Sequence, residues 1–424
     1  MKFKALTITN SKDYIFGSAP KPVRTKRGLL IGGGEVYPEL NFTLPAMLIN
    51  DTTFANIKEQ YKNIVKDSLE RAIQLESKGL IFEFETLLEM TLNPDYGVEL
   101  VKIMNEICEE YYQKFGIRSE IRLTPNDIRD YERPPLMFTS KYLEKMLELF
   151  EKGALAGGDL LSIESTGGKE ICDEAILNCD TRSVIFALNV LGVRDMKNLW
   201  KKIVEISKRT NTIPGGDTAC GFGNTAMVLA DKNFIPKIFA AFVRIATVTR
   251  TLVAYEEGAI GPDKDCAYEG PFIKVITGIP ISMEGKTAAC AHLSPLGNIA
   301  AAGADLWSNE SVQNIKLLGG FAPTVYYEQL EYDTRLFNES KRRGTEASIL
   351  LRDMLVESDV HFDPQALILS PDNVLEISKS IVQGKNYIEA SILGCNKGLD
   401  IIEKAIENKS LKCSEREIKW INII

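Results

Sequence analysis

The sequence predicts an α/β fold in which parallel strands and helices close into a (β/α)8 or TIM barrel, with additional helices at both ends. Short predicted strands alternate with helical segments of ten or more residues, which is typical of βαβ units and a parallel sheet. Polar residues recur where these short segments end, and barrels of this kind carry their active sites at the C-terminal ends of the strands. An open sheet often carries a glycine fingerprint at its switch point, and this sequence has none.

Four strands are predicted in the first half of the chain. A helix over residues 51–77 comes first, because its apolar side chains recur close to every 3.6 positions. The predicted strands then span 79–85, 118–124, 159–165 and 212–220, and the helices between them span 97–115, 140–152, 173–191 and 198–209. Later strands are harder to count, and the candidates are 272–281, 300–307 and 314–323. The charged, periodic end of the chain predicts helices over 340–358, 372–383 and 386–408.

We expect a single domain over residues 1–424, because no linker or low-complexity tract interrupts the chain. Its parts are an N-terminal helical extension (1–78), the barrel (79–338) and C-terminal helices (339–424). The polar residues at the predicted strand ends are Glu83, Glu85, Thr124, Glu164, Asp217 and Cys220.

Composition excludes several classes of protein. The net charge of −8 is the opposite of what a nucleic-acid-binding surface needs. The apolar stretch Ile235–Tyr255 is interrupted by Lys237, Arg244 and Arg250, so we do not expect it to span a membrane. The eight cysteines are scattered through a long chain, which favours free thiols, and the first residues lack the apolar core of a signal peptide. We therefore predict a cytoplasmic protein.

Three segments combine small, turn-forming residues with side chains that can bind a metal ion. They span residues 159–170, 214–225 and 261–271, and they contain Glu164, Cys220 and Cys266 respectively. These three residues are about one βα unit apart, so a barrel could bring them to one rim. Two thiolates and one carboxylate suit zinc and leave a fourth position open, as a catalytic site requires.

Alternatives to a metal site exist for each residue taken alone. A cysteine in a strand is more often a small buried hydrophobic residue than a ligand. The chain has only two histidines, His292 and His361, so sites rich in histidine and histidine-dependent triads are poorly supplied. Cys290 and His292 could form a local metal motif, although a turn or core histidine is the commoner case.

The three segments resemble those of the methanol–corrinoid protein methyltransferases, the zinc subunits that activate methanol in anaerobes. The sequences Ser-Ile-Glu-Ser-Thr-Gly-Gly-Lys-Glu, Gly-Gly-Asp-Thr-Ala-Cys-Gly-Phe-Gly-Asn-Thr and Asp-Cys-Ala-Tyr-Glu-Gly-Pro occur in the family's order, after Leu-Ile-Gly-Gly-Gly near the start. The resemblance covers essentially the whole chain. It implies an α/β barrel with Zn²⁺ bound by Glu164, Cys220 and Cys266.

The same resemblance implies an activity and a partner. A member of this family transfers the methyl group of methanol to a reduced corrinoid, which a smaller partner protein carries, so we expect a hetero-oligomer. A second methyltransferase passes the methyl group onward. Relatives that act on coenzyme M bind zinc through a His-x-Cys pair, which this sequence lacks.

The departing oxygen of methanol must also be protonated. Asp217 and Glu269 lie close in sequence to two of the expected ligands, so each is a candidate for proton donor or for orienting the ligands. Each is also compatible with a solvated or turn-capping acid.

Two rival hypotheses remain open. One is a different barrel enzyme, such as an aldolase-like or phosphosugar enzyme, in which Lys169 or Lys274 performs the chemistry without a metal. The other is a non-catalytic scaffold that zinc stabilises and that only presents the corrinoid protein.

Overall fold

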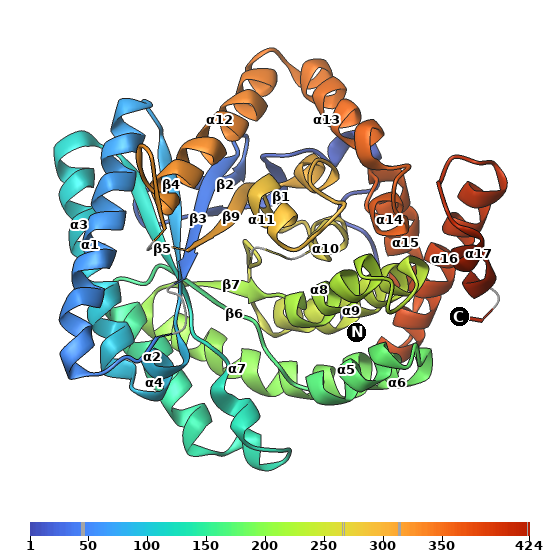
Figure 1. Cartoon of the computed structure of the whole chain (residues 1–424), viewed down its shortest axis with the longest axis horizontal. Helices are drawn as coiled ribbons and strands as arrows, with labels where there is room; N and C mark the ends of the chain where they lie inside the picture. Colours follow the sequence, from blue (N-terminus) through green and yellow to red (C-terminus); the bar gives the residue numbers. More distant parts are fainter. Residues whose placement is uncertain (44–46, 265, 267, 313–314, 422) are drawn as a thin grey trace.

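A seven-stranded sheet forms the centre of the computed structural model, which describes residues 1–43, 47–264, 266, 268–312, 315–421 and 423–424. The strand order is β7-β6-β5-β4-β3-β9-β8, and every neighbouring pair is parallel. Figure 1 shows that the sheet curls around an interior instead of lying flat. The strands are β3 (Tyr37–Thr43), β4 (Gly79–Glu85), β5 (Arg118–Thr124), β6 (Leu160–Ile163), β7 (Ile213–Asp217), β8 (Ser282–Glu284) and β9 (Leu306–Val312).

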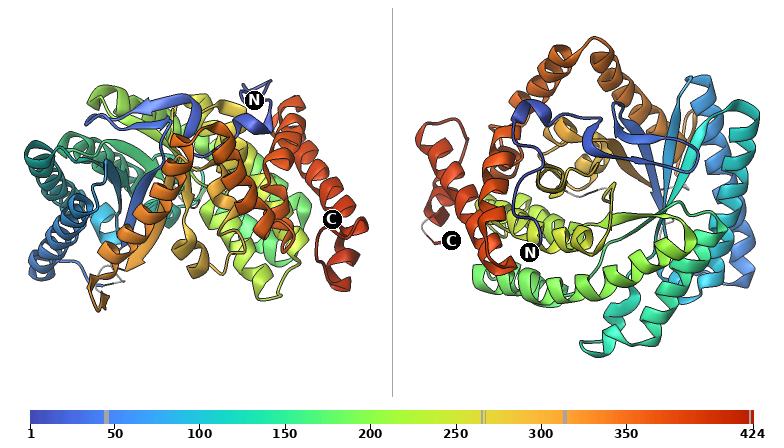
Figure 2. Two further views of the ribbon diagram at one scale, coloured as in Figure 1. Left: turned by 90° about the horizontal axis from the view of Figure 1, so that it is seen from above. Right: turned by 180° about the vertical axis from the view of Figure 1, so that it is seen from behind.

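Helices cover the outside of this sheet. Helices α12, α1, α3, α4, α7 and α9 each pack against the next around the outside of the strands (Figures 1 and 2). Their bounds are α1 (Asp51–Gln74), α3 (Pro94–Phe115), α4 (Lys141–Ala156), α7 (Val193–Thr210), α9 (Lys237–Glu257) and α12 (Ala322–Arg342). The amphipathic ones turn apolar faces inward; in α3 these include Leu100, Val101, Met104 and Ile107.

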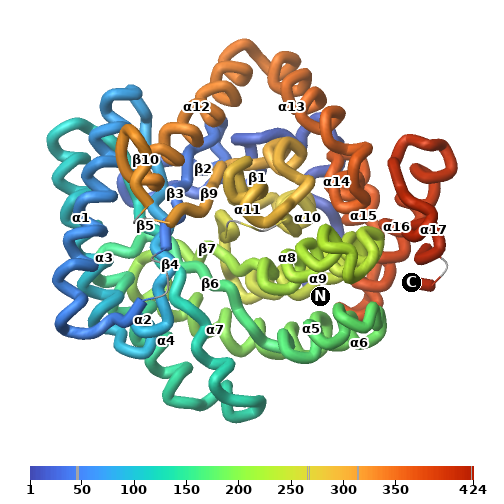
Figure 3. Tube along the Cα trace, viewed as in Figure 1, coloured from blue at the N-terminus to red at the C-terminus, as the bar shows by residue number. Residues whose placement is uncertain are grey.

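The remaining elements connect or flank this ring. Two short antiparallel hairpins pair β1 (Ser18–Arg24) with β2 (Leu30–Gly33) and β10 (Lys316–Leu317) with β11 (Gly320–Phe321). Figure 3 traces the chain from the first of these to the C-terminal helices, which lie on the far side of the molecule from α1 and α3. The other helices are α2 (Leu88–Leu92), α5 (Lys169–Leu177), α6 (Thr181–Phe186), α8 (Cys220–Asp231), α10 (Gly270–Thr277), α11 (Lys286–Ala291), α13 (Thr345–Asp359), α14 (Pro364–Ile368), α15 (Pro371–Gln383), α16 (Tyr387–Glu407) and α17 (Glu415–Ile421).

The predicted α/β class and parallel sheet are confirmed, but the N-terminal boundary is wrong. Residues 1–78, predicted to be a helical extension, contain β3, the strand that joins β4 to β9. Its sequence combines Pro38 with Glu39, which disfavours a strand assignment. Glu39 is nevertheless buried, because its carboxylate pairs with Arg122 of β5 (Oε1 to Nε, 2.6 Å) inside the curled sheet.

Two further predictions need correction. Most of the candidate strand 272–281 is helix α10, because a short apolar run fits a buried helix as well as a strand. The predicted boundary at residue 338 falls inside α12. Of the other candidates, 300–307 is a 3₁₀ helix followed by the start of β9, and 314–323 contains the β10–β11 hairpin, with Asn314 outside the described residues.

An eighth hydrogen-bonded strand is not found in the described part of the chain. The edge strands β7 and β8 are not paired with each other. Residues 260–263 lie between them: Ile260 and Gly261 donate backbone N–H groups to Pro214 and Gly215 of β7, each at 2.9 Å. The Asp263 carboxylate accepts the backbone N–H of Ser282 in β8 at 2.7 Å.

Helix α9 is long and apolar enough, by length and composition, to cross a membrane. Its apolar window is nevertheless entirely buried within the fold, where α7, α8 and α16 pack against it. Arg244 and Arg250, which face the interior from this helix, are fully buried. Helix α9 is therefore a core helix that carries two charged groups toward the strand ends.

Candidate metal centre

The structure brings Glu164, Cys220 and Cys266 together. One donor atom from each lies within 4.8 Å of the other two. Glu164 directly follows β6, Cys220 follows β7 and begins α8, and Cys266 lies in the loop before α10. The thiols are shielded, with Cys220 9% and Cys266 0% exposed, whereas the side chain of Glu164 is 37% exposed. The cluster therefore opens toward solvent on its Glu164 side.

Cys220 is fixed by the start of helix α8. The Glu269 Oε1 atom accepts the backbone N–H of Ala219 at 2.6 Å and the hydroxyls of Thr218 and Thr251 at 3.4 and 3.0 Å. Glu269 is fully buried, and its other oxygen, Oε2, has no hydrogen-bond partner among the described residues. A helix N-terminus favours negative charge, so this position suits a thiolate.

Glu164 is held through the residue that follows it. Asp217 accepts the backbone N–H of Ser165 at 3.2 Å, and Arg250 donates to the Ser165 carbonyl at 2.6 Å and to its hydroxyl at 2.7 Å. Asp217 also accepts the indole N–H of Trp200 at 2.8 Å and lies 3.5 Å from Arg250. These buried groups fix the backbone on which Glu164 stands.

A buried lysine links Glu164 to two carboxylates from β4. Lys264 Nζ lies 3.1 Å from Glu164 Oε1 and 3.2 Å from Glu83 Oε1, and it also pairs with Glu85. Thr124 at the end of β5 donates to Glu83 at 2.8 Å. This lysine and its ion pairs therefore bring together four of the polar residues predicted at the strand ends: Glu83, Glu85, Thr124 and Glu164.

A second group of donors adjoins Cys266 on another side. Cys266, Glu284 and Glu310 also offer donor atoms within 4.8 Å of one another. His292 lies between the two carboxylates, with Nδ1 3.0 Å from Glu284 and Nε2 3.6 Å from Glu310, and Tyr268 donates its hydroxyl to Glu284 at 2.5 Å. The flanking Asp265 and Ala267 lie outside the described residues. Cys266 itself has a φ of 58°, a left-handed conformation that costs a non-glycine residue free energy.

The electrostatics of the cluster favour a bound cation. A hydrogen bond with Cys266 lowers the pKa of Cys220, but burial and the charges of Glu164 and Glu284 raise this pKa well above its usual value. Without a cation the Cys220 thiol therefore keeps its proton at neutral pH. A metal ion would supply the positive charge that a thiolate needs here.

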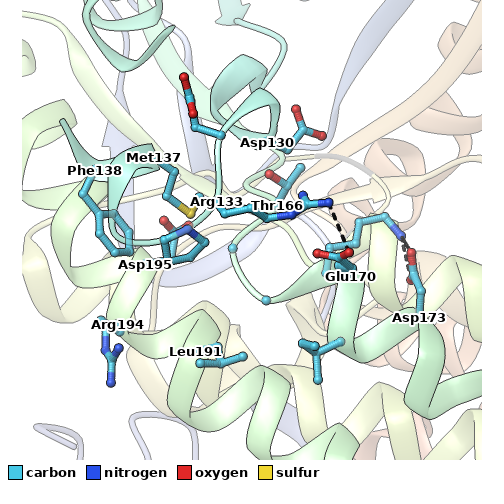
Figure 4. Close-up of a pocket in the computed structure, with 16 residues that line it drawn as sticks. Asp130, Arg133, Met137, Phe138, Thr166, Glu170, Asp173, Leu191, Arg194 and Asp195 are labelled. Atoms are coloured by element: carbon cyan, nitrogen blue, oxygen red, sulfur yellow. Dashed lines mark hydrogen bonds and ion pairs between the residues drawn. The ribbon is translucent and has the colours of Figure 1, made fainter. Parts of the chain in front are cut away.

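A cavity beside Glu164 adjoins a second, larger cavity. The smaller, about 360 Å³, is lined by Glu164 and by the ends of β3, β4 and β5. The larger, about 550 Å³, shares Asp130 and Thr166 with it and extends toward Met137 and Phe138. Figure 4 shows the larger cavity, with Arg133 joined to Glu170 (3.1 Å) across one side.

The loop of residues 164–168 borders both cavities and is held in place by buried contacts. Arg129, which is 1% exposed, forms ion pairs with Asp127 (2.6 Å) and Asp195 (2.7 Å), and Asp127 in turn accepts the backbone N–H of Thr166 at 2.9 Å. Gly168 has a φ of +86°, and a Cβ there would lie 2.6 Å from the Ala187 carbonyl oxygen, so only glycine fits.

The structure places the other predicted residues away from this cluster or in structural roles. Lys169 forms an ion pair with Asp173 on its own helix, at 2.6 Å. Lys274 of α10 is buried next to the start of β9, at the N-terminal ends of the strands and away from the cluster. Its ammonium group donates hydrogen bonds to Asp305 and to two backbone carbonyls. Cys290 is exposed and belongs to neither donor group. All eight cysteines are free thiols, as predicted.

Several residues at the cluster were not singled out by the sequence analysis. Lys264 stands two residues before Cys266, and Asn224 stands four residues after Cys220, on the same face of α8. Both lie within the segments predicted to bind a metal ion. For Asn224, its spacing of four residues from Cys220 could have indicated a contact if a helix had been predicted there. Glu284 and Glu310 had no local motif that would mark them.

Known proteins of one family are similar to this chain over almost its whole length. Residues 1–424 match the family described as methanol-cobalamin methyltransferase B subunit. The chain is 38% identical over 427 residues to the methanol–corrinoid protein co-methyltransferase of Methanosarcina barkeri (strain Fusaro / DSM 804), covering 99% of this chain and 90% of that protein. It superposes with a TM-score of 0.93 and 35% identity on a chain in the crystal structure of the methanol:cobalamin methyltransferase complex MtaBC from Methanosarcina barkeri, covering 99% of this chain and 91% of that chain.

Proposed function

Because the chain belongs to the methanol-cobalamin methyltransferase B subunit family, we propose that it is a methanol–corrinoid protein co-methyltransferase that depends on zinc. It transfers the methyl group of methanol to the reduced corrinoid of a partner corrinoid protein, with which it forms a complex. The zinc ligands are Glu164, Cys220 and Cys266.

One observation carries this proposal: three donors from separate segments of the chain, two of which follow β6 and β7, converge within 4.8 Å. Ligand atoms around a tetrahedral zinc ion lie about 3.8 Å apart at the usual bond lengths, so small side-chain movements suffice. Two sulfurs and one oxygen form a donor set that zinc favours, with one position left for a substrate. The residues present therefore fit the ion.

The charge around the cluster supports a divalent cation independently of the donor geometry. Lys264 contributes one positive charge against the three carboxylates that it contacts, Glu83, Glu85 and Glu164. The two thiols add further negative charge when they are ionised. Glu164 has a second oxygen, so its ion pair with Lys264 and a bond to a metal can coexist.

A zinc ion bound here would supply Lewis acidity, drawing negative charge from the methanol oxygen as the carbon–oxygen bond weakens. The protein's part is to hold the three ligands and keep the fourth side accessible. Cys220 and Cys266 lie on the shielded side, so methanol is expected on the side of Glu164. The opening beside Glu164 is the side from which a corrinoid would approach the centre.

We assign orientation, not proton donation, to Asp217 and Glu269. Both carboxylate oxygens of Asp217 are engaged: one by the backbone of Ser165 and by Arg250, the other by Trp200. Neither oxygen is directed at the three proposed ligands. Glu269 holds the backbone immediately before Cys220. Each acid therefore places the peptide that carries a ligand.

The cavity beside Glu164 and the larger one that adjoins it are the proposed route for the partner's corrinoid. A corrinoid is too large for a narrow pocket, so its cobalt can reach the site only through a wide opening. The two cavities share Thr166 and Asp130 and together extend the opening from Glu164 toward Met137. The rim around them is then an interface with the corrinoid protein.

Three finer structural statements belong to the same proposal. Residues 260–263 act as the eighth position of a closed barrel, since their backbone bonds to β7 and Asp263 bonds to β8. The chain forms one domain, because a single large apolar core includes residues from Ile8 to Leu411. The cytoplasmic location is supported by the free thiols.

The rival hypotheses are less compatible with the geometry. A Schiff-base lysine should lie at the C-terminal strand ends, but Lys274 lies at the other end and Lys169 is paired with Asp173. A purely structural zinc ion is usually enclosed by four protein ligands, whereas the described residues of this cluster offer three, and the cluster is open at Glu164.

The test is the metal content of the purified protein, wild type beside Cys220→Ala and Cys266→Ala, with Cys108→Ala as a buried thiol remote from the cluster. We expect one zinc ion per chain in the wild type and in Cys108→Ala, and a large loss in the two ligand variants. Methyl transfer from methanol to a reduced corrinoid should fall with the zinc content. Zinc that is absent, or unaffected by the ligand variants, would refute the proposed centre.

Thermal unfolding of the same variants separates catalysis from a scaffold role. A catalytic site predicts that the ligand variants keep the fold and lose activity. If both melted like the metal-free chain and had no separable defect in activity, the scaffold hypothesis would replace the catalytic one.

A further inference from the structure

Asn224 contacts the sulfur of Cys220 from the same face of helix α8. Its Nδ2 atom lies 3.1 Å from Cys220 Sγ, within hydrogen-bonding reach for a sulfur acceptor. The two residues are four positions apart, which places them one turn apart on a helix. Asn224 is 7% exposed, so little water competes for this contact.

Arg244 determines which way the Asn224 amide points. Its Nη2 atom lies 3.3 Å from Asn224 Oδ1, and it also donates to Gln365 of α14 at 3.4 Å. A guanidinium group can only donate hydrogen bonds, so the amide oxygen must face it. The amide N–H₂ group is thereby left to face Cys220.

The position of Arg244 is itself specified by its surroundings. The guanidinium lies over the ring of Tyr268, with 5.0 Å from Cζ to the ring centroid. A Cβ at residue 223 would lie 2.3 Å from Arg244 Nη1, so the approach requires Gly223. Arg244 is fully buried, and its Nε and Nη1 atoms have no hydrogen-bond partner in the described part of the chain. Burying a guanidinium with two donors unsatisfied among the described residues is costly, and its contacts with Tyr268, Asn224 and Gln365 fix its direction.

We propose that Asn224, oriented by Arg244, is a positioning residue that donates a hydrogen bond to the Cys220 sulfur when this sulfur binds the metal ion. A hydrogen bond to a ligating thiolate withdraws electron density from the sulfur and fixes its direction. Two thiolates and a carboxylate weaken the Lewis acidity of a zinc ion, and the Asn224 contact partly restores it. This inference rests on the proposed metal centre and adds a specific way in which the chain adjusts it.

The proposal can be tested on protein in which Co²⁺ replaces zinc, because cobalt–thiolate charge-transfer absorption reports the electron density on sulfur. Loss of the hydrogen bond in Asn224→Ala should move this absorption to lower energy. It should also weaken the apparent affinity for Zn²⁺ about 10- to 100-fold, which is typical when an outer partner of a metal ligand is removed. Asn224→Asp should show an effect at least as large, because a carboxylate close in size to the amide has no N–H to donate.

A pair of glycine variants tests the part played by Arg244 without touching Asn224. Gly223→Ala displaces the guanidinium and should shift the absorption in the same direction, by a smaller amount. Gly221→Ala is the matched control on the same helix, since a Cβ there would meet only Lys169 at an ordinary 3.5 Å. Thr225→Ala removes a hydroxyl that bonds to the Gly221 carbonyl and not to sulfur, and it should leave the spectrum unchanged.

The possible outcomes distinguish a failure of the metal centre from a failure of the role of Asn224. If the wild type binds Co²⁺ without thiolate absorption, the metal centre and this inference both fall. If the wild type shows the absorption while Asn224→Ala and Asn224→Asp match it in energy and in Zn²⁺ affinity, the centre stands and the role of Asn224 is refuted. An Asn224→Asp variant that matches the wild type would show that the side chain serves packing alone.

Discussion

Substitution of Asp217 separates its two possible roles most directly. Asp217→Asn keeps the size of the side chain but removes its charge. In the native protein the carboxylate accepts from Trp200 (2.8 Å) and Ser165 N (3.2 Å) and lies 3.5 Å from the buried Arg250. An amide has only one accepting atom, so at least one of these donors loses its acceptor, and Arg250 loses its nearby negative charge.

The size of the effect follows from these contacts. Removing one partner of a buried ion pair costs about 3–5 kcal/mol. Because Arg250 keeps the carbonyl and hydroxyl of Ser165 as acceptors, we expect about 3 kcal/mol, the lower end. Urea unfolding measures this loss, and zinc content should fall with it because the peptide after Glu164 is released.

A control and a refuting result complete this test. Asp173→Asn removes a carboxylate from the partly exposed pair with Lys169, and the stability should change by less than about 1 kcal/mol. If Asp217→Asn unfolded at the wild-type urea concentration, kept its zinc and yet lost methyl transfer, Asp217 would be acting in the chemistry, and our assignment of orientation would be wrong.

Three further predictions concern the acids and the metal. In Glu269→Gln the amide oxygen can accept the same hydrogen bonds at the start of α8, so zinc content and methyl transfer should stay within about tenfold of the wild type; a far larger loss of activity with zinc retained would identify a proton donor. Burial and the charge of Glu120 raise the pKa of Asp159 from 3.8 to about 8. Between these two pH values the folded state keeps a proton on Asp159 that the unfolded state has released. The free energy of unfolding should therefore fall as pH rises from about 4 to about 8. The free energy of unfolding, measured by urea titration across this range, should fall less steeply with pH in Asp159→Asn, by up to about 1.4 kcal/mol per pH unit, and equal slopes would contradict the assignment. Removal of the metal by a chelator should lower the unfolding temperature reversibly, since free zinc at a hundred times its Kd stabilises the folded state by about 2.7 kcal/mol, and calorimetry with and without added zinc checks this.

The sequence was most informative where local pattern and tertiary environment agree. Strands β4 and β5 match their predicted bounds, because β4 is a largely apolar run that ends at Glu85 and β5 ends directly before Pro125. Strand β3 was missed since the charge of Glu39 is paired with Arg122, which lies about eighty residues further along the chain. Helix α10 was mistaken for a strand because all its residues, Lys274 included, are buried, and its apolar run therefore has no helical periodicity.

The three proposed ligands could be selected from the sequence because each lies in a segment rich in small residues. Their convergence could only be expected from the barrel, and the structure brings them together. Lys264 and Asn224 lie inside the same segments, yet spacing alone does not show which acid or thiol each contacts. Glu284, Glu310 and His292 come from elements near the end of the sheet and had no motif that would connect them with Cys266.

The anchors of two of the three donors, Glu164 and Cys220, lie on one helix. Glu164 depends on Arg250 of α9 through Ser165, and the Cys220 sulfur depends on Arg244 of the same helix through Asn224. The two arginines are six residues apart on one buried helix, so a displacement of α9 would disturb two ligands at once. This common support argues that α9, which its composition alone would describe as an apolar core helix, is part of the machinery that sets the geometry of the site.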